Sequence, residues 1–103
     1  MKKYSVVFSD EAYDDLDAIF YGILSEYQDL LGARRTVNRI IAKCHSLEFF
    51  PNGYIVRKVI DSFAVRYVRS GKFIAAYYID EGQKRIIILR IVYGGMDLDV
   101  IFG

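Results

Sequence analysis

Two arginines fall inside strand-like stretches whose other residues are suited to burial. Arg66 is predicted on a central strand, and Arg90 interrupts an apolar run near the end of the chain. A guanidinium stays charged, so its removal from water is costly unless it meets a carboxylate or a phosphate. Two interpretations follow: the arginines pair with an internal carboxylate such as Asp80 or Asp97, or they bind an anion of another molecule.

The other reactive side chains do not suggest a site. Cys44 and His45 are neighbours, but adjacent helix positions point about 100° apart, so we expect a buried thiol and a surface imidazole. Asp97 and Asp99 lie close together near glycines, but two acids alone are a weak basis for a metal site. No zinc-ligand, dinucleotide or phosphate-loop motif occurs. We therefore expect neither a metal nor a cofactor.

The first half of the chain is predicted to be a strand followed by a helix. Residues 3–8 are rich in aromatic and β-branched side chains, which is typical of a strand. Ser9 suits a helix N-cap, and the acids directly after it favour the first helical turn. Apolar residues then recur at helical spacing as far as Tyr27. The acids off this stripe are expected to be solvated, namely Asp14, Asp15 and Asp17.

A second helix is predicted after Gly32, which breaks the helical pattern. It is expected from about Ala33 to Phe50 and is stopped by Pro51-Asn52-Gly53. The short link makes the two helices an antiparallel hairpin. Bases recur every four residues along the outer side of this helix, at Arg35, Arg39 and Lys43.

The second half is predicted to be four strands joined by tight turns. The strands are Tyr54–Ile60, Phe63–Arg69, Lys72–Ile79 and Arg85–Tyr93. Links of hairpin length between consecutive strands produce an antiparallel meander. Residues 1–103 are therefore expected to form one α+β domain of order β-α-α-β-β-β-β, with the helix hairpin packed on one face of the sheet.

The last two strands are apolar on both sides, although a sheet covered on one face normally alternates apolar and polar residues. Two helices in a chain of this size cover only one face. The other face is therefore predicted to bind a partner, unless the C-terminal tail or a second copy of the chain covers it. The expected partner-binding residues are Ile74, Ala76, Tyr78, Ile86, Ile88 and Arg90.

Composition and charge limit the function classes. One cysteine excludes an internal disulfide and fits a reducing cytosol, and no apolar run reaches the length of a membrane span. Residues 1–29 hold two bases and seven acids, whereas the remainder holds twelve bases and six acids. With a net charge of only +1, two halves that neutralise each other are favoured over a nucleic-acid-binding surface.

The order of elements and several short segments resemble the RelE/ParE superfamily of bacterial toxins from type II toxin–antitoxin modules. The opening YSVVFSDEAYDDLDAI is similar to the first strand and helix of that family, and ARRTVNRIIAKCHSLEFFPNG to its second helix with a Pro-Gly stop. Arg66-Tyr67, then Phe73 to Tyr77 with Asp80, and finally LRIVYGGMD resemble its three final strands. The resemblance covers nearly the whole chain.

This resemblance implies a cytoplasmic toxin held inactive in a hetero-oligomer by an antitoxin segment that packs on its exposed sheet and helices. ParE-like members inhibit DNA gyrase, and we expect this chain to act in that way, by binding proteins. RelE-like members instead cleave messenger RNA in the ribosome. A third alternative is a degenerate toxin that binds only its antitoxin.

The nuclease pattern is incomplete in this chain. Ile74, Met96 and Phe102 stand where RelE-like toxins carry an arginine, a later arginine and a terminal tyrosine. The residues left for phosphate binding and acid catalysis are Arg66, Arg90 and Tyr93, with Lys72 as a further candidate, and no good general base accompanies them. The basic pair frequent in ParE-like members is also replaced, by Gly95-Met96.

Overall fold

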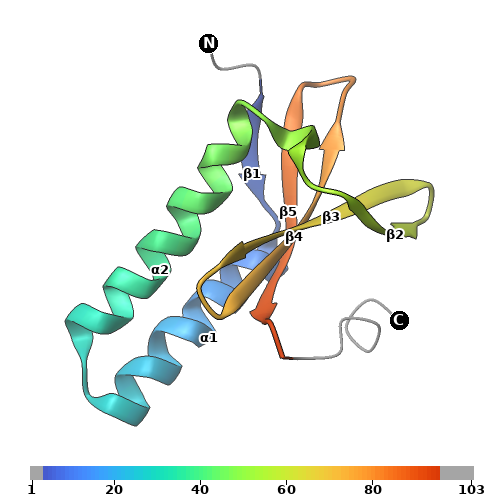
Figure 1. The fold of residues 1–103 in the computed structure, drawn as a ribbon. Helices are drawn as coiled ribbons and strands as arrows, with labels where there is room; N and C mark the ends of the chain where they lie inside the picture. Colours follow the sequence, from blue (N-terminus) through green and yellow to red (C-terminus); the bar gives the residue numbers. More distant parts are fainter. Residues whose placement is uncertain (1–3, 96–103) are drawn as a thin grey trace.

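The computed structural model describes residues 4–95 and confirms the predicted α+β class, with two helices on one face of a sheet (Figure 1). The elements are β1 (Ser5–Phe8), α1 (Asp10–Tyr27), α2 (Leu30–His45), β2 (Val56–Ile60), β3 (Phe63–Ser70), β4 (Phe73–Asp80) and β5 (Arg85–Tyr93). Two short 3-10 helices, Ser46–Glu48 and Pro51–Gly53, connect α2 to β2. Between residues 4 and 95, neither helix has the length and apolar character needed to cross a membrane.

The sheet has the strand order β1-β5-β4-β3-β2. The last four strands form the predicted antiparallel meander. The sequence did not place β1, which pairs in parallel with β5, with Ser5 opposite Arg85 and Phe8 opposite Ile88. The long connection that parallel pairing requires comprises both helices and the strands β2 to β4. The sheet is therefore mixed, and β1 and β2 are its outer strands.

The start of α1 follows the sequence prediction. Ser9 has extended backbone angles, and its side-chain oxygen accepts a hydrogen bond from the Ala12 amide at 3.0 Å. Asp10 and Glu11 occupy the first turn, where carboxylates favour the positive end of the helix dipole. The N-cap therefore fixes the position at which the chain leaves β1.

The predicted break at Gly32 was wrong, because the chain turns four residues earlier. Gln28 adopts a left-handed conformation with φ 48° and ends α1, and Asp29 caps α2 by accepting from the Gly32 amide at 2.9 Å. A Cβ atom at Gly32 would lie 2.2 Å from Asp29 Oδ2. Glycine is therefore needed inside the first turn of α2 to admit the capping carboxylate, and it does not interrupt the helix.

The second helix is also shorter than predicted and ends at His45. The chain continues as the two 3-10 helices, and Leu47 in the first of them is buried in the core. The apolar residues therefore continue at helical spacing after α2 has ended, and for that reason the predicted helix extended to Phe50. Tyr77 holds the second 3-10 helix by donating its hydroxyl hydrogen to the Pro51 carbonyl at 2.7 Å.

The hydrophobic core lies between the helix pair and one face of the sheet, here called the helix side. Tyr77 and Cys44 have no exposed surface there. The buried core residues are Tyr4, Ala12, Leu16, Ile40, Cys44, Leu47, Val68, Ala75, Tyr77, Ile86, Ile88 and Ile91. The opposite face of the sheet is here called the second face.

A β-bulge divides β5 into two halves. Ala76 pairs with Arg90 but Tyr77 pairs with Ile88, so Leu89 is an extra residue with no opposite on β4. An extra residue exchanges the sides to which the following side chains point. Ile88 before the bulge and Ile91 after it therefore both belong to the helix-side core.

Helix α1 closes the edge of β5 at this bulge, where β1 has already ended. Ser9 donates its hydroxyl hydrogen to the Leu89 carbonyl at 2.8 Å, and its amide donates to the Ile88 carbonyl at 2.9 Å. Asp15 accepts from the Ile91 amide at 2.8 Å and from two nitrogens of Arg90 at 2.8 and 3.0 Å. We call this set the α1–β5 lock. The prediction that Asp15 is solvated was wrong, because its carboxylate accepts hydrogen bonds from Arg90 and from the Ile91 amide at the edge of β5.

We expect Asp15→Asn to lower the free energy of unfolding by about 2 kcal/mol, because it removes charge-assisted hydrogen bonds at a partly buried site. Urea denaturation followed by circular dichroism measures this loss. The matched control is Asp14→Asn on the exposed side of α1, for which the change should stay within about 0.5 kcal/mol. Equal effects of the two variants would contradict the lock.

We expect the Cys44 thiol to be inert in the folded protein. Burial raises its pKa to about 12, and the thiolate is the species that reacts with disulfide reagents. Colour release from Ellman's reagent at neutral pH should therefore follow unfolding. A Cys44→Ala, Ser25→Cys variant supplies an exposed reference thiol. Reaction of native Cys44 at the rate of that reference would overturn the assignment.

Candidate functional site: two faces of the sheet

The three residues proposed for a nuclease site do not come together. Arg66 lies on the helix side, opposite Tyr77, and its guanidinium donates to the Tyr54 carbonyl. Arg90 is bound to Asp15 at the sheet edge, and this ion pair raises the Arg90 pKa. Both guanidinium groups therefore hold structural positions.

Tyr93 lies at the far end of β5, half-exposed and edge-on to the Phe73 ring, with the ring centroids 6.2 Å apart. It contributes to a groove of about 680 Å³ between the helix hairpin and the β3–β4 turn. The groove also contains Tyr27, Arg39 and Lys72. Tyr93 therefore faces the helix side, away from the Arg90 guanidinium at the strand edge.

Arg66 and Arg90 do not pair with Asp80, one of the two carboxylates predicted as their partners. Asp80 pairs with Arg85, whose Nη2 lies 3.2 Å from the Asp80 carboxylate. Hydrogen bonds from the Gln83 amide and from Arg85 lower the Asp80 pKa. Asp97 lies outside the described residues. The expectation that Arg90 needs a carboxylate is confirmed, with Asp15 as the partner.

The second face keeps three of the six predicted partner-binding residues as a cluster. Ile74, Ala76 and Tyr78 alternate with the core-facing residues of β4, and Ile74 and Tyr78 retain partial exposure. Phe63 lies beside Tyr78, with the ring centroids 4.5 Å apart. Among residues 4–95, both helices lie on the other side of the sheet (Figure 1). The exposed part of this face therefore lies around Phe63, whereas Ala76 and its neighbours on the same face, Val65 and Val92, are buried.

Ile86 and Ile88 were wrongly placed on this face. Both are fully buried on the helix side, because the bulge at Leu89 reverses the alternation along β5. Arg90 lies opposite Ala76, as predicted for the second face, but its guanidinium reaches the strand edge to meet Asp15. A strict alternation of sides along β5 produced the error.

The second face is bordered by cations that sequence reasoning did not single out. Arg57 and Arg69 line a hollow of about 290 Å³ together with Tyr67 and Ile74. Arg69 also lies against Gly94, where a Cβ atom would come within 2.9 Å of its Nη1. Arg69 could have been assigned to this face, because it is two residues from Tyr67 on the same strand. Arg57 could not, because a bulge interrupts the alternation of β2 at that residue.

The remaining candidate residues of the described part of the chain do not form a metal site. Between residues 4 and 95, no cluster of three or more His, Cys, Asp or Glu side chains could hold a metal ion. His45 pairs with Glu48 at 3.1 Å on the helix surface, away from the buried Cys44 thiol. Asp99, Met96 and Phe102 lie outside the described residues.

Comparison with solved structures places this fold among toxins of known complexes. The chain matches the structure of a chromosomal ParDE toxin–antitoxin system from P. aeruginosa with a TM-score of 0.75 and 24% identity, covering 88% of this chain and 96% of that one. A RelBE2 toxin–antitoxin complex from Mycobacterium tuberculosis matches with a TM-score of 0.63 and 20% identity over 88% and 98% of the two chains.

An archaeal RelE–RelB complex from Pyrococcus horikoshii OT3 matches with a TM-score of 0.65 and 16% identity, over 92% of this chain and 99% of that one. No curated protein matches in sequence. The family model described as the ParE toxin of the type II toxin–antitoxin system parDE matches residues 6–98. With nearly its whole length matched, the chain belongs to the ParE toxin family.

Proposed function

We propose that this toxin acts by binding proteins: an antitoxin segment neutralises it on the second face of the sheet, and DNA gyrase is its target. The observation that carries the proposal is the structural use of Arg66 and Arg90. The Arg90 guanidinium is engaged by Asp15, and the Arg66 guanidinium is directed to the Tyr54 carbonyl, so the two are not brought together on one phosphate. The family match favours the ParE type of action over the RelE type.

The chemistry of the second face indicates what the antitoxin segment should carry. The register puts Arg69 and Arg85 on this face, and Arg85 is paired there with Asp80. The exposed ring of Phe63 and the half-buried side chains of Ile74 and Tyr78 lie on the same face. A segment that presents apolar side chains flanked by carboxylates would be complementary.

One observation supports the alternative of a ribosome-dependent ribonuclease: Arg57, Arg69 and Tyr67 line the same hollow. Two guanidinium groups beside a phenol could bind a phosphodiester. Cleavage also needs a general base, and the residues that line this hollow include no carboxylate or imidazole. The hollow therefore supports anion binding more directly than catalysis.

The target is tested by adding the purified toxin to DNA gyrase and relaxed plasmid. We expect supercoiling to fall with toxin concentration and to recover when the antitoxin is added. Induction in cells without antitoxin should give a DNA damage response. Normal supercoiling together with cleavage of ribosome-bound messages would contradict the proposal in favour of a nuclease. Normal growth with neither effect would contradict it in favour of a protein that binds only its antitoxin.

The neutralising surface is tested by Ile74→Asp, which puts a charge on the second face near the start of β4. We expect antitoxin affinity to fall by roughly tenfold or more, because an uncompensated carboxylate is desolvated in the interface. Tyr21→Glu on α1, where the tyrosine is 63% exposed, is the matched control. Titration calorimetry gives both affinities. A loss confined to the control would place the antitoxin on the helices.

A further inference from the structure

The two helices of the hairpin carry opposite charges. Helix α1 contains six acidic residues and no Lys or Arg, whereas α2 contains four Lys or Arg residues and no acid. Among residues 4–95, no ion pair joins these two sets. The small net charge of the chain therefore does not describe the surface of α2, which is basic by itself.

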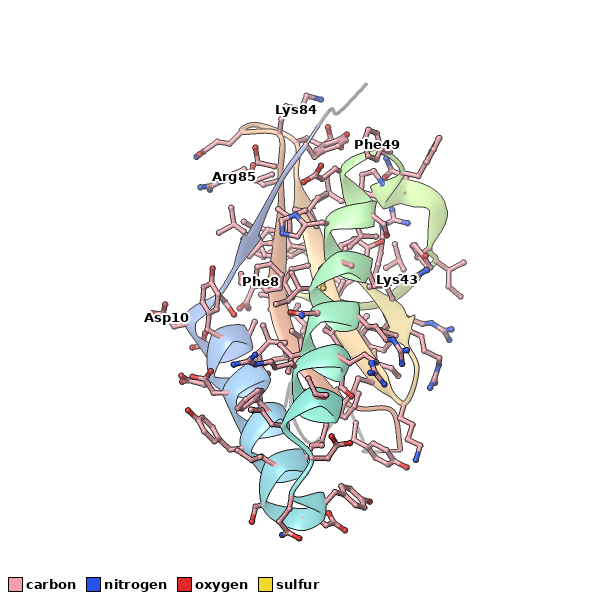
Figure 2. All side chains as sticks on the ribbon, turned by 90° about the vertical axis from the view of Figure 1, so that its left-hand side faces the viewer. Phe8, Asp10, Lys43, Phe49, Lys84 and Arg85 are labelled. Carbon is pink, nitrogen blue, oxygen red and sulfur yellow. The ribbon has the colours of Figure 1, made fainter. Side chains whose placement is uncertain are left out.

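Three of the bases form a row along the exposed side of α2. Arg35, Arg39 and Lys43 follow one another at intervals of four residues, so about 6 Å of helix rise separates successive members. All three are exposed, and the buried residues of α2 lie on its core side. Figure 2 shows the Lys43 side chain projecting from α2 on the side away from α1. We call these three residues the α2 row.

The β3–β4 turn adds a fourth cation. Lys72 and Arg39 line the same groove, so the turn faces this side of α2. Glu26 and Asp29 also line the groove, but Asp29 caps the start of α2 and lies ten residues before Arg39, roughly 15 Å along the helix. Within the described range 4–95, neither Arg39 nor Lys72 forms an ion pair. Unpaired cations from two elements therefore border one groove.

The side chains that accompany these bases are small or polar. Asn38 and Ala42 are exposed beside the row, and Thr36 lines the groove. No large apolar side chain is exposed between residues 35 and 43. A tightly bound peptide needs apolar or aromatic anchors at the centre of its interface, whereas contacts to nucleic-acid phosphates use Arg, Lys and small polar side chains such as Asn and Thr. The α2 row therefore suits a phosphate backbone better than a peptide.

A second copy of this chain is a weaker occupant. Its acidic α1 has the complementary charge, but exposed ion pairs contribute little to association. Because Lys43 projects away from α1, the acidic and basic surfaces of one copy do not form a single face that a two-fold axis could exchange between copies (Figure 2).

We propose that the α2 row and Lys72 bind the phosphate backbone of a nucleic-acid duplex, independently of base sequence. This activity goes beyond the proposed inhibition of gyrase and does not depend on it. A duplex carries about one negative charge per 1.7 Å of its axis, so the about 12 Å covered by the row meets several phosphates. The guanidinium groups of Arg35 and Arg39 would bind phosphate oxygens in pairs, and the two lysines would act as point charges. The acids of α1 would repel the same backbone and confine it to α2.

The test measures fluorescence anisotropy of labelled probes with the full chain. The probes are two DNA duplexes of about 20 base pairs and unrelated sequence, an RNA duplex of the same length, and polyglutamate. We expect the two DNA duplexes to bind within about twofold of each other. The logarithm of the association constant should fall with the logarithm of the salt concentration with a slope between about −3 and −4, since each neutralised phosphate contributes about −0.9 and four cations are available.

Binding of either kind of duplex supports the proposal, and the tighter kind identifies the source of the phosphates. Tighter binding of polyglutamate than of any duplex would overturn it in favour of an acidic protein segment. Failure of every duplex to bind at low salt would overturn it as well.

Variants place the binding on the row. Arg35→Ala, Arg39→Ala and Lys43→Ala should each weaken duplex binding by roughly threefold to tenfold and reduce the salt slope by about 1. The matched control is Arg34→Ala, an exposed base of the same helix turned by about 100° from Arg35, which should change affinity less than about twofold. Alanine favours a helix, so folding is expected to persist, and circular dichroism checks it. Equal loss in the control, an unchanged salt slope, or self-association without nucleic acid that Arg39→Ala abolishes would overturn the proposal.

Discussion

The carboxylate of Asp15 connects the two halves of this molecule. It accepts the Ile91 amide and two nitrogens of Arg90, at the point where β1 has ended and the edge of β5 would otherwise be open. Ser9 satisfies the Leu89 carbonyl at the bulge of the same strand. Unsatisfied backbone groups at a part-buried edge are costly, so the first turns of α1 complete a sheet that β1 is too short to complete.

The bulge held by this lock determines what each side of the sheet presents. Because Leu89 is an extra residue, Ile88 and Ile91 can both enter the helix-side core although they are an odd number of residues apart. The helices in turn cover only part of that side. Apolar surface therefore remains exposed at Phe63 beside Tyr78 on the second face and at Val56 and Val59 on β2.

The order of elements, the Ser9 cap and the antiparallel meander could be predicted from the sequence. Each depends on local features: apolar residues that recur at helix or strand spacing, a capping side chain, or a short turn. Sequence reasoning placed the break between the two helices at Gly32 instead of Gln28, because a glycine in the first turn of a helix resembles a helix break. The partnership of Asp15 could not be predicted, since it joins residues 75 positions apart. Alternation predicted Ile74, Ala76 and Tyr78 correctly on β4 but misplaced Ile86 and Ile88, because a bulge leaves no composition signal.

The dependence of the fold on the α1–β5 lock is tested most directly by amide hydrogen exchange at Ile91, measured by nuclear magnetic resonance in the wild type and in the Asp15→Asn variant. The account predicts that the Ile91 amide is among the slowly exchanging amides of the wild type, and that the variant loses protection there by at least roughly tenfold while Val68 on β3 changes much less. Rapid exchange of the Ile91 amide in the wild type, at the rate of an unpaired edge strand, would contradict it.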